Sequence, residues 1–64
     1  MIYDEKFKEK VIEDTIKGII KIYGYSRAAA EKAVKESNLQ WSIDFAPDMI
    51  AHCSLEQLVD MVIA

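Results

Sequence analysis

His52 and Cys53 are the residues best suited to metal binding or nucleophilic chemistry, and each is the single residue of its type in the chain. On a helix, neighbouring side chains point about 100° apart, so these two cannot grip one ion. A zinc site needs three or four converging ligands, and a Cys–His nucleophile needs both groups within hydrogen-bond reach. Asp48 and His52 have the i,i+4 spacing of an ordinary surface pair. We expect no metal site, no cofactor and no catalytic residue.

Acidic residues are the second group that could carry chemistry, as an acid–base pair or as ligands of a divalent cation. Four of them follow residue 37, namely Asp44, Asp48, Glu56 and Asp60. Their spacing does not match an EF-hand loop, and the chain has no glycine-rich phosphate loop. A solvated acidic rim is the simpler interpretation. We therefore expect the protein not to be an enzyme.

Aromatic residues remain, because Trp and Tyr often anchor protein interfaces. Two interpretations stay open. In the first, Trp41 and Phe45 fill the core of a small bundle. In the second, Tyr23, Gly24, Tyr25 and residues near them form an exposed patch for a partner. The candidate partner-binding residues are Tyr23, Gly24, Tyr25, Trp41, Asp44 and Asp48.

Tyr23, Gly24 and Tyr25 form the tyrosine loop, which a long preceding helix must position. From Asp4 to Tyr23 the apolar residues recur at steps of three and four, which is typical of one helical stripe. Asp4 is a plausible N-cap, and Gly24 supplies the left-handed residue that commonly ends a helix. Gly18 inside this helix costs about 1 kcal/mol relative to Ala, which indicates close approach by another backbone.

A second helix is predicted over Arg27–Ser37, with Ser26 as its N-cap and Asn38 at its end. Its alanine-rich face allows close packing. The link of about two residues is short, so this helix should turn back and cover Ile16–Ile20.

The stretch Ile19–Tyr25, the following Ser26–Val34 and then Asn38 resemble the first two helices of ubiquitin-associated (UBA-like) domains, whose loop reads Met-Gly-Phe or Met-Gly-Tyr. The resemblance covers about 20 residues and places that loop on Tyr23, Gly24 and Tyr25. It implies a compact three-helix module that binds a partner through the loop and the last helix. Tyr23 stands where the family has Met.

The segment 39–47 alternates large apolar residues at 39, 41, 43 and 45, a period of two that formally suits a strand. A lone strand would leave its backbone groups unpaired, so a helical turn that starts near Ser42 or Asp44 is the better prediction. Ser54 and Gln57 then match the reciprocal capping pattern that opens a last helix. Its apolar residues are at 55, 58, 59 and 62.

Charge is unevenly distributed along the chain, whose formal net charge is −3. All eight Lys and Arg lie in residues 1–37, and residues 38–64 have four acids and no base. Phosphate backbones and anionic lipids are bound by clustered Lys and Arg, so we expect no nucleic-acid and no membrane partner. A single cysteine and a start without a signal-peptide pattern favour a cytoplasmic location.

These observations predict one domain over residues 1–64, an all-α small bundle of three main helices plus a short helical turn. Its expected function is non-catalytic protein–protein interaction. Homodimerisation is one form of it, because a 64-residue chain that cannot form an internal disulfide often needs association for stability. The expected dimer interface is Leu58, Met61, Val62 and Ile63. The alternative is a small acidic regulator or inhibitor, of the type that phages and mobile elements encode, which occupies a basic site on a host protein.

Overall fold

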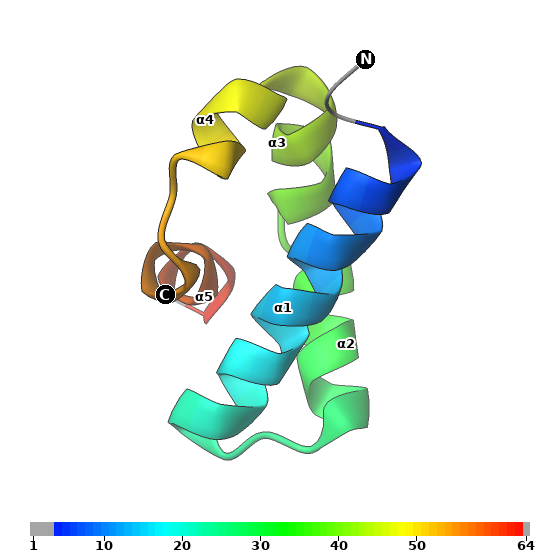
Figure 1. The fold of residues 1–64 in the computed structure, drawn as a ribbon. Coiled ribbons are helices and arrows are strands. Elements are labelled where there is room, and N and C mark those ends of the chain that lie inside the picture. The colour runs from blue at the N-terminus through cyan, green and yellow to red at the C-terminus, as the bar shows by residue number, and fades with distance from the viewer. Residues whose placement is uncertain (1–3, 64) are drawn as a thin grey trace.

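The computed structural model describes residues 4–63, which form five α-helices joined by short links. The helices are α1 Glu5–Tyr23, α2 Arg27–Glu36, α3 Leu39–Phe45, α4 Pro47–Ala51 and α5 Leu55–Ile63. Helix α1 is the central element, because α2, α3 and α5 all pack against it (Figure 1). Helices α3 and α4 lie near the amino end of α1, and the loop that leads into α2 lies at its other end. The predicted all-α bundle is confirmed.

The predicted ends of α1 are confirmed in detail. The Asp4 carboxylate accepts a hydrogen bond from the backbone N–H of Phe7 at 3.1 Å. Gly24 ends the helix with a φ of 72°, and its N–H donates to the Ile20 carbonyl at 2.9 Å. Because this backbone conformation is left-handed, glycine is the residue that adopts it without strain.

Helix α2 begins as predicted and ends slightly earlier. The Ser26 hydroxyl accepts a hydrogen bond from the Ala29 N–H at 3.2 Å, as an N-cap should. The helix stops at Glu36 with Ser37 as its C-cap, and Asn38 precedes α3 instead of ending α2.

The middle segment contains two helices where a single turn was predicted. Helix α3 begins at Leu39, ahead of Ser42 and Asp44, the predicted starting points. The break comes at Ala46, whose φ of −141° and ψ of 66° are not helical. Pro47 explains the break, because proline disfavours helical backbone in the preceding residue but is well tolerated as the first residue of a helix.

The alternation of large residues in this segment reflects two sides of a helix. Leu39 and Ile43, four residues apart, are buried with 2% and 3% of their surfaces exposed. Trp41 and Phe45, offset from them by two residues, are on the outer side. On a helix, a step of two residues turns the side chain through about 200°, so a period of two over a few residues also separates an inner from an outer face.

The start of α5 is also confirmed. The Ser54 N–H donates to Oε1 of Gln57 at 2.8 Å, and the Gln57 N–H donates to the Ser54 hydroxyl at 3.2 Å. This is the reciprocal capping arrangement that the sequence predicts.

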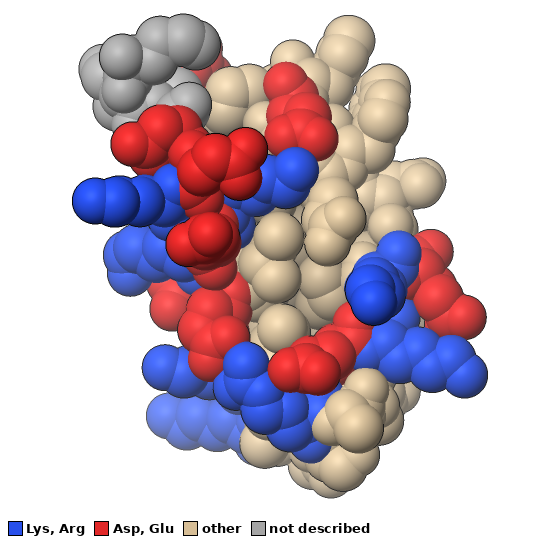
Figure 2. All heavy atoms as spheres, turned by 90° about the vertical axis from the view of Figure 1, so that its right-hand side faces the viewer, with Lys and Arg blue, Asp and Glu red and all other residues tan. Residues whose placement is uncertain are grey.

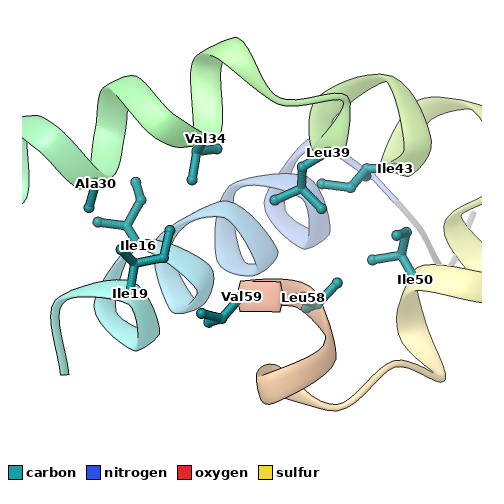
Figure 3. Close-up of a cluster of buried hydrophobic side chains, with 9 residues drawn as sticks. All are labelled: Ile16, Ile19, Ala30, Val34, Leu39, Ile43, Ile50, Leu58 and Val59. Carbon is teal, nitrogen blue, oxygen red and sulfur yellow. The ribbon is translucent and has the colours of Figure 1, made fainter. Parts of the chain in front are cut away.

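Each of the five helices sends at least one side chain into a common core (Figure 3). As predicted, α2 covers the middle of α1, since Ala30 and Val34 lie over Ile16 and Ile19. The nine buried hydrophobic residues among those described are Ile16, Ile19, Ala30, Val34, Leu39, Ile43, Ile50, Leu58 and Val59.

Gly18 marks a very close contact between α1 and α5. A Cβ atom on Gly18 would lie 2.8 Å from Cγ2 of Val59 and 3.3 Å from Cδ1 of Leu55. The sequence indicated close approach by another backbone, whereas the neighbours are side chains of α5. The absence of a side chain at residue 18 therefore lets α5 sit against α1.

We predict that Gly18→Ala lowers the free energy of unfolding by roughly 1 kcal/mol, measured by urea denaturation. The better helix propensity of Ala is worth about 1 kcal/mol, but overpacking of a filled core costs about 1–3 kcal/mol. Val59 is fully buried and its β-branched side chain has little freedom to move away.

The control is the same substitution in a Val59→Ala background. There the added methyl group has room, so Gly18→Ala should be stabilising. An equal effect of Gly18→Ala in both backgrounds would show that contact with Val59 does not limit this position.

Candidate interaction surface

Trp41 and Phe45 on α3 and Met49 on α4 are large apolar side chains exposed to solvent, and we call these three residues the apolar stripe. Their exposed fractions are 63%, 73% and 63%. The Trp41 and Phe45 rings are stacked, with centroids 4.8 Å apart and planes inclined by 9°. The interpretation of Trp41 and Phe45 as core residues is therefore wrong. Grouped exposed apolar side chains of this size are typical of interaction sites.

The stripe is held in place from its inner side. Leu39, Ile43 and Ile50 are each at least 97% buried and fix α3 and α4 on the core. Because the anchoring residues share helices with the stripe, the exposed side chains stand on ordered backbone. A partner would therefore meet a preformed surface.

Acidic side chains flank the stripe. Asp44 accepts hydrogen bonds on both carboxylate oxygens from Nζ of Lys8, each at 3.0 Å, which joins α3 to α1. Asp48 directly precedes Met49 and forms no hydrogen bond or ion pair with another of residues 4–63, His52 included. Asp48 is therefore the carboxylate of this flank that remains available to a partner.

The tyrosine loop is a separate surface. Tyr23 and Tyr25 are partly exposed and meet edge to face, with ring centroids 6.3 Å apart. The Tyr23 hydroxyl donates to Oδ1 of Asp60 at 3.4 Å, which ties the loop to α5. Desolvation, followed by the charge of Asp60, raises the pKa of Tyr23. This loop and the stripe lie at opposite ends of α1, so the structure does not bring the predicted partner-binding residues together (Figure 1).

The predicted dimer interface on α5 is largely used within the chain. Leu58 is a core residue with 6% of its surface exposed, which corrects its assignment to an interface. Val62 and Ile63 are partly buried against the same core. Met61, with 48% exposed, is the member of this set that presents a large surface.

Cys53 is half-buried, and its thiol donates to the Met49 carbonyl at 3.3 Å. This bond ties the residue after α4 to the carbonyl of Met49 within that helix. In the described part of the chain, no group of three or more His, Cys, Asp or Glu is placed to hold a metal ion.

A groove between α1 and α2 was not predicted from the sequence. Its volume is about 550 Å³, and its apolar floor consists of Ile12, Ile16 and Val34. Gln40, the neighbour of Trp41, lines one end. In Figure 2, the uncharged surface of this face extends from the upper right to the middle, with charged side chains on its left and at its lower right. The charged and polar residues of the groove are Glu9, Glu13, Arg27, Glu31, Lys32, Lys35 and Gln40.

Arg27 links the two walls of this α1–α2 groove. Its Nη1 and Nη2 donate to the two carboxylate oxygens of Glu13 at 2.9 and 2.6 Å, and its Nε donates to Glu31 at 2.9 Å. The hydrogen bonds from Arg27 hold the pKa of Glu13 below its ordinary value. Lys32 and Lys35 form no ion pair with another of residues 4–63, so the α2 wall keeps two available cations.

We predict that Arg27→Gln raises the pKa of Glu13 towards its ordinary value, as measured by an NMR titration of the Glu13 side chain. A carboxylate whose pKa is lower in the folded state contributes stability above its unfolded pKa, and this contribution disappears as the pH falls through the folded pKa. The parent should therefore lose more stability than the variant on acidification. Lys35→Gln, which removes an unpaired cation of the same groove, is the control. Equal titration midpoints of Glu13 in the parent and in Arg27→Gln would show that the hydrogen bonds from Arg27 do not lower the pKa of Glu13.

Comparison with known protein families, with curated proteins and with solved structures finds no match for this chain. Within residues 4–63, no helix is both long enough and apolar enough to cross a membrane. A functional proposal must therefore be built on the surfaces described above.

Proposed function

We propose that the chain is a non-catalytic protein–protein interaction domain and that the apolar stripe is its docking surface. The observation that carries the proposal is the stacked and exposed pair Trp41 and Phe45 on α3, together with exposed Met49 on the adjoining helix α4. Trp is among the residues that most often dominate binding energy, and Met adapts its shape to a partner. Contact with an apolar partner surface would remove these three side chains from water.

A second candidate function is the acidic regulator or inhibitor that occupies a basic site on another protein. The available carboxylate of Asp48 beside the stripe favours it. The two candidates differ in their salt dependence. Binding through the stripe changes little with salt, whereas binding through exposed carboxylates weakens steeply as the ionic strength rises.

The stripe can be tested by affinity capture from an extract of the source organism. We predict that the parent captures a protein that the double variant Trp41→Ala/Phe45→Ala does not retain. With the purified partner, the double variant should bind roughly 30-fold more weakly, which corresponds to the ~2 kcal/mol of a strong interface residue. Both residues are mostly exposed, so the fold should survive, and circular dichroism checks this.

The matched control is Ile22→Ala/Tyr25→Ala, which removes exposed apolar surface at the other end of α1. This variant should bind the partner as the parent does. Loss of binding in the control with retention in the stripe variant would instead support docking at the tyrosine loop, as the UBA-like resemblance implies. Equal binding by all three proteins would refute both locations.

A further inference from the structure

The stripe and the α1–α2 groove differ in shape and share helix α3, which carries Trp41 and Phe45 and contributes Gln40 to the groove. Gln40 lines the groove and is followed directly by Trp41, the first residue of the stripe. The stripe presents exposed aromatic side chains, whereas the groove is a hollow of about 550 Å³ with three aliphatic side chains on its floor. A groove of this kind can accept aromatic side chains from another molecule.

The groove is lined by three acids, Glu9, Glu13 and Glu31, and three bases, Arg27, Lys32 and Lys35. Arg27 pairs with Glu13 and Glu31, so Glu9 on α1 and the two lysines on α2 are left, and the α2 wall is the side that can attract carboxylates. Asp44 and Asp48 flank the stripe, and its segment, residues 38–64, contains no base. Lys32 and Lys35 stand on the α2 wall of the groove and have no ion-pair partner within residues 4–63. Insertion of the stripe with its acidic side towards α2 would therefore bring opposite charges together. A contact of stripe with stripe would instead place the carboxylates of two molecules close to each other, which is unfavourable.

We propose that the chain forms a two-fold symmetric dimer in which the apolar stripe of each copy occupies the α1–α2 groove of the other. The inference rests on the proposed function of the stripe as a docking surface. Because the stripe and the groove share helix α3 on one chain, a two-fold axis between them forms the same contact twice and closes the assembly at two copies. Such a dimer removes apolar surface from water in a chain too short to bury much of it alone.

Trp41, the single tryptophan of the chain, reports directly on this contact. As the protein concentration rises, sedimentation equilibrium should show conversion of monomer to dimer. Over the same range the Trp41 emission should shift to shorter wavelength and acrylamide should quench it less. We predict that Trp41→Ala/Phe45→Ala and Lys32→Glu/Lys35→Glu each raise the dissociation constant of the dimer at least tenfold. Ile22→Ala, on another face of α1, should leave it unchanged.

Mixing the two variants provides the sharpest test. The stripe variant retains an intact groove and the groove variant retains an intact stripe, so a mixed dimer has one of its two contacts complete. The mixture should form dimers at concentrations at which each variant alone is monomeric.

A parent that remains monomeric at millimolar concentration would overturn the proposed dimer, and so would a mass that grows beyond two copies. Dimers of Lys32→Glu/Lys35→Glu as stable as those of the parent would also overturn it. A monomeric parent that still captures another protein through Trp41 and Phe45 would refute the dimer alone. Capture of that protein by Trp41→Ala/Phe45→Ala as strongly as by the parent is the result that would refute the stripe as a docking surface.

Discussion

The contact between α1 and α5 at Gly18 decides how the long first helix is buried. Because residue 18 has no side chain, Val59 and Leu55 approach α1 to within the space that a Cβ would fill. That approach brings Val59, fully buried, and Leu58 into the same core as Ile19 (Figure 3). Without α5, the apolar face of α1 would be covered mainly by α2, whose buried side chains are the small Ala30 and Val34.

Helices α3 and α4 complete the core beside α5. The space left near the amino end of α1 is filled by Leu39 and Ile43 of α3 and by Ile50 of α4. These three residues are enough to hold two short helices on the core, and Lys8 and Asp44 add an ion pair at the edge. Exposed pairs of this kind contribute little stability, so the apolar anchors carry the attachment.

The sequence predicted the elements whose signals are local. Each cap residue forms its hydrogen bond with a residue only three or four positions away. The structure confirms the predicted caps at Asp4, Gly24, Ser26 and Ser54. The middle segment was harder, because Leu39/Ile43 and Trp41/Phe45 are both apolar pairs at helical spacing. Which pair faces inward depends on the space between α1 and α5, and no local pattern encodes that. The α1–α2 groove escaped prediction for the same reason, since it depends on how far α2 covers Ile12 and Ile16.

The choice between these two pairs bears on function. Burial of the larger aromatic pair would remove more apolar area from water, at about 25 cal/mol for each Å². The fold nevertheless buries Leu39 and Ile43 and leaves Trp41 and Phe45 exposed and stacked on each other. A close-packed interior accepts only side chains that fit its volume, so the core selects the smaller pair. The apolar area that remains outside would add stability if another protein surface covered it, and the proposed docking function of the stripe rests on this area.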